Sequence, residues 1–277
     1  MMSPLVQVIL ICLATFVGAV AMGAIPFTKA AQKFLNRLED MTGLAAGFLI
    51  GAAMLVAIPE GIEMLGHAAE ASASAEINYF SVGFALLLGF IFMMILEAFG
   101  FGHDIHEEHH DHAAAHGHEH INHPHKSVMP AIVGLTVHAF IDGMVIGAAM
   151  AEGSAALTFT MVLVIMMHKF PAAFSVSAFS LHERHNRSRS KMDLLIFAAA
   201  TPVAIIVFWN LFQHFSPVGR GLAVLFSAGT FLYIATVDVL PAMHVIAKAR
   251  RVAGFVLMGV VAILVLTLVS HSLLDLH

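Results

Sequence analysis

Long apolar stretches alternate with short polar segments along almost the whole chain, and this pattern predicts membrane-spanning helices. A helix that crosses the hydrocarbon core needs about 20 predominantly apolar residues. Eight stretches meet this requirement, at residues 5–26, 42–65, 78–101, 128–150, 156–181, 192–214, 221–246 and 253–273. The connections between them are short, except for residues 102–127. We therefore expect an all-α polytopic membrane protein with one transmembrane domain, residues 1–277.

Basic residues gather on alternate connections, and their positions predict the orientation of the chain. If there are eight spans, one side holds 11 of the 13 lysines and arginines, whereas the other side holds only Arg220. Lysine and arginine are enriched in short cytoplasmic loops. We therefore expect both termini outside and residues 102–127 in the cytoplasm, with the protein in the cell (inner) membrane.

The composition agrees with this pattern and excludes several classes of protein. Hydrophobic residues make up 59% of the 277 residues and charged residues only 11%, against about 25% charged in soluble domains. A net charge of −5 does not favour nucleic-acid binding. The single cysteine, Cys12, rules out a disulfide framework within the chain and a cysteine-based metal site.

Metal-ligating side chains lie inside two predicted spans, where ionisable residues are rare. His138 and Asp142 are four residues apart and therefore share one helix face. His168 lies at a matching depth in the next span. An ionisable residue inside a membrane costs about 2.5–3.5 kcal/mol on insertion scales, and such residues mark ion pathways. Two imidazoles and a carboxylate can bind one metal ion and leave a fourth position open. The alternative is a hydrogen-bonded pair that only holds the bundle together.

Lys169 follows His168 directly and therefore points about 100° around the same helix. A lysine ammonium in hydrocarbon needs a carboxylate or loses its proton, and Asp142 is the nearest candidate by depth. We interpret Lys169 as a fixed positive charge at the place of a second metal ion. Pro171, three residues after His168, predicts a kink, which serves either the site or packing.

The long connection is rich in histidine and acidic residues, which suit zinc and similar divalent ions. We expect it to be disordered and to bind metal weakly; the alternative is a solvated linker. The candidate metal contacts in it are His103, His106, His109, His110, His112, His116, His118 and His120.

Two motifs around the intramembrane ligands resemble those of the ZIP zinc/iron transporter family. That family carries H-N-x-x-D/E-G in its fourth helix and H/Q-D/E/K-x-P-E-G in its fifth, and here these positions read HAFIDG (138–143) and HKFPAA (168–173). IPEG (58–61) resembles the end of its second helix, and residues 227–241 resemble its seventh. The H-K-x-P-A form resembles one branch of the family.

The departures from the family motifs concern a second metal site. Members with two metals use three further ligands, whose positions here are Ala139, Lys169 and Ala172. The resemblance therefore implies one transport site, made by His138, Asp142 and His168. It also implies a 3+2+3 helix bundle with an inverted repeat, metal movement into the cytoplasm and a homodimer.

Other acidic residues are candidates for the ion path, and other functions remain open. We expect the metal to enter past Glu60, near the outer end of the second span, and to leave past Asp238 in the seventh. The first hypothesis is a transporter for zinc, with Fe, Mn or Cd as alternative substrates, and without enzymatic activity or an organic cofactor. The alternatives are a cation-diffusion-type metal exporter and an intramembrane zinc hydrolase.

Overall fold

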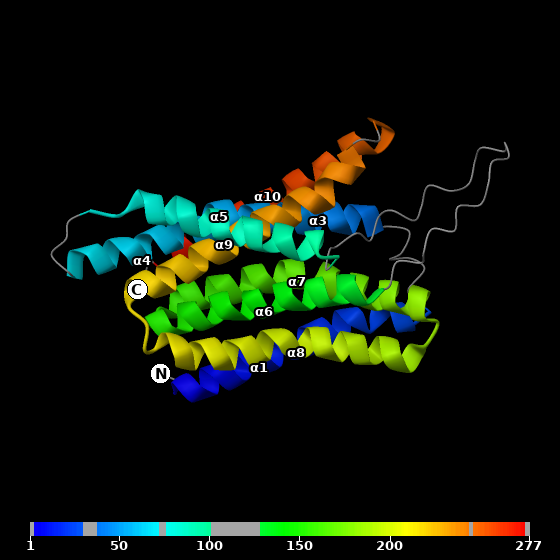
Figure 1. The fold of residues 1–277 in the computed structure, drawn as a ribbon, viewed down its shortest axis with the longest axis horizontal. Helices are drawn as coiled ribbons and strands as arrows, with labels where there is room; N and C mark the ends of the chain where they lie inside the picture. The colour runs from blue at the N-terminus through cyan, green and yellow to red at the C-terminus, as the bar shows by residue number, and fades with distance from the viewer. Residues whose placement is uncertain (1–2, 30–37, 72–75, 101–127, 244–245, 275–277) are drawn as a thin grey trace.

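The computed structural model describes residues 3–29, 38–71, 76–100, 128–243 and 246–274, and the regular elements within these ranges are all helical (Figure 1). Eight helical segments in this part of the chain are long and apolar enough to cross a membrane. The prediction of an all-α polytopic membrane protein is therefore confirmed. The histidine-rich connection lies outside the described residues. The inverted repeat stays a prediction.

The helices follow the predicted spans closely, with one span divided into three parts. In chain order they are α1 (Pro4–Gly23), the 3-10 turn η1 (Ile25–Phe27), α3 (Leu38–Gly51), the π-helical turn η2 (Ala52–Ala57), α4 (Ile58–Ala71), α5 (Tyr79–Ala98), α6 (Val128–Glu152), α7 (Ala155–Arg184), α8 (Arg187–Phe212), α9 (Pro217–Met243) and α10 (Ile246–Leu274).

The second span contains the π-helical turn because of the proline that follows it. Pro59 has no N–H to donate, and its ring would clash with the carbonyl four residues earlier in a regular α-helix. The wider turn η2 comes directly before this proline and separates α3 from α4. The span then runs on to Glu70 rather than ending near residue 65. Glu60 lies ten residues before the end of this helical segment, and its place near the outer end of the ion path stays a prediction.

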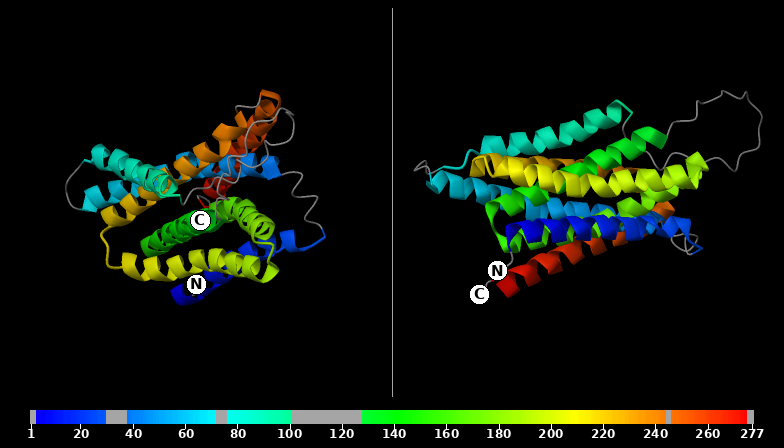
Figure 2. Two further views of the ribbon diagram at one scale, coloured as in Figure 1. Left: turned by 45° about the vertical axis from the view of Figure 1, so that its right-hand side comes forward. Right: turned by 90° about the horizontal axis from the view of Figure 1, so that it is seen from below.

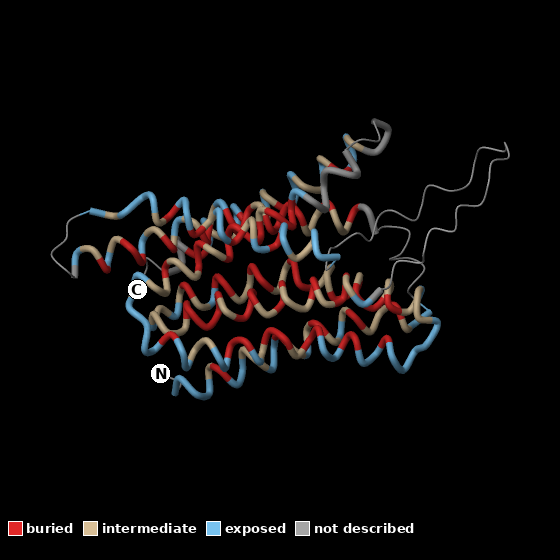
Figure 3. The backbone as a smooth tube through the Cα atoms, in the orientation of Figure 1, coloured by how far each residue is buried: buried red, intermediate tan, exposed pale blue. Residues whose placement is uncertain are grey.

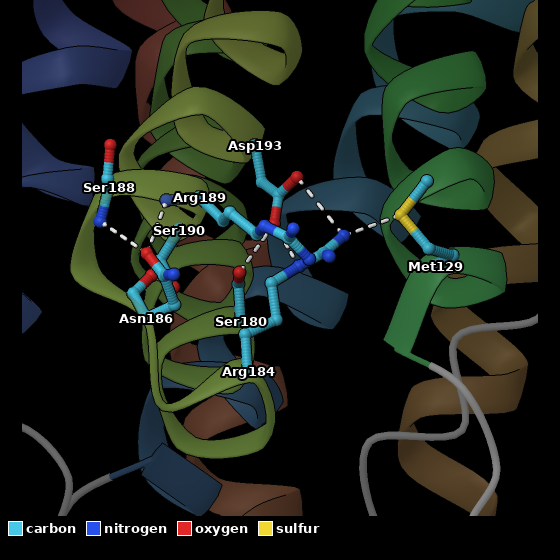
Figure 4. Close-up of polar contacts among 8 residues, drawn as sticks. All are labelled: Met129, Ser180, Arg184, Asn186, Ser188, Arg189, Ser190 and Asp193. Carbon is cyan, nitrogen blue, oxygen red and sulfur yellow. Dashed lines mark hydrogen bonds and ion pairs between the residues drawn. The ribbon is translucent and has the colours of Figure 1, made fainter.

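The turn between α7 and α8 is much shorter than the sequence pattern predicts. His185 adopts a left-handed conformation (φ 47°) and ends α7. The side-chain oxygen of Asn186 then accepts hydrogen bonds from the backbone amides of Ser188 and Arg189, both at 3.1 Å (Figure 4). This N-cap starts α8 at Arg187. The predicted span, which starts at residue 192, therefore begins later than the helix, because the capping residue precedes the apolar stretch by six residues.

An ion pair joins α7 and α8 next to this turn. The Arg184 guanidinium lies 2.7 Å from Asp193 Oδ2, and the Ser180 hydroxyl donates to the same carboxylate (Figure 4). Arg184 also reaches the sulfur of Met129 in the first turn of α6. The helices α6, α7 and α8 are therefore joined to one another at this end.

The helices form two groups that lie against each other (Figures 1 and 2). The first helix group contains α1, α6, α7 and α8, which pack on one another. The second helix group contains α3, α4, α5, α9 and α10, with α9 against the other four. The groups meet where α9 contacts α6 and where α3 contacts α7. The helices α6 and α7 therefore lie at the boundary between the groups.

Side-chain burial follows the expectation for a bundle in lipid, since the buried positions face other helices and large apolar side chains face outward (Figure 3). Glycines permit close contact between α6 and α8. A Cβ on Gly143 would lie 2.4 Å from the Thr201 carbonyl oxygen, and one on Gly147 would lie 2.9 Å from the Phe208 Cβ. These two glycines therefore serve helix packing.

Candidate metal centre

Three potential metal ligands meet inside the first helix group. His138 and Asp142 lie one turn apart on α6, and His168 lies on α7. Asp142 Oδ1 is 3.6 Å from His138 Nε2 and 3.3 Å from His168 Nε2. All three residues are buried, with relative exposures of 3%, 1% and 2%. The structure thus brings together the three side chains that the sequence pattern indicated.

The spacing of these atoms suits a tetrahedral zinc ion. Zinc bonds to imidazole nitrogen and carboxylate oxygen are about 2.0–2.2 Å long, so two ligand atoms of one tetrahedral ion lie about 3.3–3.6 Å apart. Both measured distances from Asp142 Oδ1 fall in this interval. One ligand atom from each residue can be chosen so that all three lie within 4.8 Å of one another. The geometry leaves a fourth position for a ligand that does not come from the three residues.

The charges and polar atoms of the cluster also suit a cation. A carboxylate buried in hydrocarbon is costly unless it is paired or coordinates a metal. Within the described residues, the only direct polar contacts of Asp142 are to His138 and His168. The Nδ1 atoms of both histidines are buried and have no hydrogen-bond partner in the described part of the chain. A bound cation would compensate the carboxylate.

Phe231 of α9 covers the cluster from the second helix group. Its ring centroid lies 5.7 Å from that of His138 and 5.4 Å from that of His168, with interplanar angles of 82° and 62°. The side chain is 1% exposed. Sequence reasoning missed this residue, because a phenylalanine in an apolar helix carries no signal that separates it from ordinary core.

Lys169 is oriented toward α8 rather than toward the carboxylate. Its ammonium donates a 2.5 Å hydrogen bond to Thr201 Oγ1 and lies 4.5 Å from the centre of the Phe197 ring. The Thr201 hydroxyl donates in turn to the Ala139 carbonyl oxygen at 2.6 Å. No ion pair within 4.0 Å joins Lys169 and Asp142, so the expected direct pairing does not form. Thr201 was also missed, although a lone threonine among alanines in a span marks a polar position.

Among the described residues, the ligand cluster consists of His138, Asp142 and His168 and does not include Glu60. Glu60 lies in the first turn of α4 and is partly buried. Asp238 belongs to α9, but its side chain is not among those the structure describes. The candidate ligands in the histidine-rich connection lie outside the described residues. Pro171 lies inside α7, which continues through it to Arg184.

Comparison with known proteins agrees with the geometry. The family model described as "ZIP Zinc transporter" matches residues 102–267. The chain is 33% identical to zinc transporter ZIP9 of Xenopus tropicalis over 263 residues, which cover 84% of this chain and 83% of that protein. It is 32% identical to zinc transporter ZIP9 of Micropogonias undulatus, over 84% of this chain and 83% of that protein.

A more distant relative is also named as a zinc transporter. Human zinc transporter ZIP2 is 26% identical over 186 residues, which cover 61% of this chain and 59% of that protein. The match to the family model and the similarity to the ZIP9 proteins over most of both chains lead to one conclusion. The chain belongs to the ZIP zinc transporter family.

Proposed function

We propose that this protein carries divalent metal ions, zinc foremost, across the membrane into the cytoplasm through a single site made by His138, Asp142 and His168. The observation that carries the proposal is the buried three-ligand cluster, whose spacing suits one tetrahedral ion. Membership of a zinc transporter family supports the same substrate. Nitrogen and carboxylate ligands also accept Fe²⁺, Mn²⁺ and Cd²⁺, so these ions are the alternative substrates.

The location of the cluster suits transport better than catalysis. The ligands lie about halfway along α6 and α7, where the two helix groups meet. A relative movement of these groups would expose the ion to one side and then to the other. The relatives are named as transporters, which supports transport. A hydrolase would also need a general acid or base beside its metal, in addition to the three ligands.

A single ion per site follows from the position of Lys169. Lys169 stands at the position where two-metal members of the ZIP family carry an acidic residue, and its side chain is buried beside the cluster. A second cation there would be repelled. The distribution of basic residues supports outer termini and a cytoplasmic histidine-rich connection, and we propose the cell (inner) membrane as the location. Passage past Glu60 and Asp238, and assembly as a homodimer, belong to the same proposal.

The test is zinc uptake into vesicles that contain the purified protein and a trapped zinc indicator. His138→Ala and His168→Ala should each reduce uptake to the level of empty vesicles, because each removes one of three ligands. His182→Ala is the matched control, since this histidine also lies on α7 but is exposed. Thermal unfolding of each variant separates lost transport from lost folding. Normal uptake by folded His138→Ala protein would exclude the proposed site.

A further inference from the structure

The three ligands leave the coordination of a bound ion incomplete, and Phe231 lies beside them. A tetrahedral zinc ion would need one more ligand, whereas Mn²⁺ and related ions prefer six and would need three. Phe231 offers no ligand atom, and its ring contacts both histidine rings. The ring also comes from α9, in the second helix group, whereas all three ligands come from the first.

We propose that Phe231 determines the metal selectivity of the site, because its ring limits the bound ion to about one ligand from outside the protein. This inference rests on the proposed function, since it assumes that His138, Asp142 and His168 bind the ion. Restricting water at the cluster favours zinc, which accepts four ligands, over Mn²⁺ and Fe²⁺, which keep several waters. The apolar shell of a metal site controls solvent access in this way.

The residues beside the Phe231 ring indicate what its removal would do. A cavity lined only by apolar side chains stays dry, whereas a water is held where two to four polar atoms can bond to it. His138 Nδ1 and His168 Nδ1 are buried without hydrogen-bond partners among the described residues. Ser227, one turn before Phe231 on the same face of α9, also has a buried hydroxyl of this kind. Because the two histidine rings contact Phe231 and Ser227 lies one turn away on the same helix, we expect the space left by the ring to take up water.

Variants of different size distinguish a role of Phe231 in selectivity from a role in packing alone. If Phe231 only filled space, replacing it by a large or a small apolar side chain would leave the coordination of the ion unchanged. If Phe231 excludes water from the ion, only the variants that open the space should change its coordination. Phe231→Leu keeps most of the apolar volume, whereas Phe231→Ala removes it.

The experiment uses Co²⁺ as a spectroscopic probe of the full-length protein in detergent. Four-coordinate Co²⁺ has intense visible absorption bands, and the bands weaken as the ion gains ligands. The native protein and Phe231→Leu should give the intense spectrum, and Phe231→Ala the weak one. In competition binding, Phe231→Ala should lower the preference for Zn²⁺ over Mn²⁺ by about tenfold or more. Phe212→Ala is the control, because it removes an equally buried ring, on α8, outside the cluster.

The outcomes distinguish this inference from the proposed function. Unchanged Co²⁺ bands and an unchanged Zn²⁺/Mn²⁺ preference in folded Phe231→Ala protein would overturn the inference and leave transport intact. The expected spectra without zinc uptake in vesicles would overturn transport and leave the selective role of Phe231 intact. If Phe231→Ala does not fold, Phe231→Val opens part of the same space, and unchanged bands in that variant would also overturn the inference.

Discussion

The Lys169 ammonium donates a 2.5 Å hydrogen bond to Thr201 Oγ1, so the charge in the middle of α7 is held by a neutral hydroxyl on α8. The hydroxyl has its own hydrogen directed to the Ala139 carbonyl oxygen on α6. Its lone pairs are thus free to face the ammonium. This chain of two hydrogen bonds joins three helices and fixes a positive charge next to His168.

Replacing Thr201 by valine should destabilise the protein, because the shape is kept while the acceptor of a buried ammonium is lost. An unsatisfied buried polar group costs about 1–3 kcal/mol, and more if it is charged. Thr201→Ser keeps the hydroxyl and is the matched control. The measurement is the free energy of unfolding in detergent. Equal stability of the valine and serine variants would show that the ammonium has another partner.

Lys169→Asp should allow a second metal ion to bind, because it replaces a repelling charge by a ligand beside the cluster. The measurement is the number of zinc ions per chain after dialysis, by elemental analysis. Lys169→Met is the control, since it removes the charge without adding a ligand, and it should still bind one ion. One ion per chain in the folded aspartate variant would contradict the interpretation of Lys169 as a substitute for a second metal.

Gly143→Ala should destabilise the contact between α6 and α8 and disturb the site one residue away. The new Cβ would lie 2.4 Å from the Thr201 carbonyl oxygen, a backbone atom that cannot move without moving α8. Overpacking of this kind costs about 1–3 kcal/mol. Gly254→Ala is the control, because a Cβ there meets no atom within 4 Å. Unfolding temperature and zinc affinity should fall for the first variant alone.

The spans and the ligand cluster could be predicted from the sequence because both follow from local rules. Apolar length defines a span, and the spacing of four residues places His138 and Asp142 on one helix face. His168 could be added because the short connection after residue 150 makes the two helices antiparallel neighbours. Asn186 also carries a sequence signal, because asparagine is a favoured N-cap residue, whereas the apolar pattern alone places the start of the span later.

Other parts of the site depend on contacts between distant segments and could not be read in the same way. Phe231 is 63 residues from His168, and only the packing of α9 against α6 brings it to the histidines. The orientation of Lys169 was wrongly inferred from depth alone, because depth does not say which neighbouring helix the side chain faces. The polar position of Thr201 was visible, but the helix it contacts was not.

The Arg220–Glu152 ion pair should contribute to the contact between the two helix groups, because it joins α9 to α6. Arg220 Nε lies 2.8 Å from Glu152 Oε2, and the side chains are only 13% and 21% exposed. Arg220 Nη1 also donates to the carbonyls of Phe212 and Phe215. Close charge pairs of this kind have coupling energies of about 0.5–3 kcal/mol. A double-mutant cycle compares the unfolding free energies of Arg220→Gln, Glu152→Gln and the double variant. If the effects of the two single variants add up to that of the double variant, there is no coupling.

Arg220→Lys should be less stable than the native protein but more stable than Arg220→Gln. A lysine keeps the positive charge, but it lacks the planar guanidinium that bonds the carboxylate and the two carbonyls together.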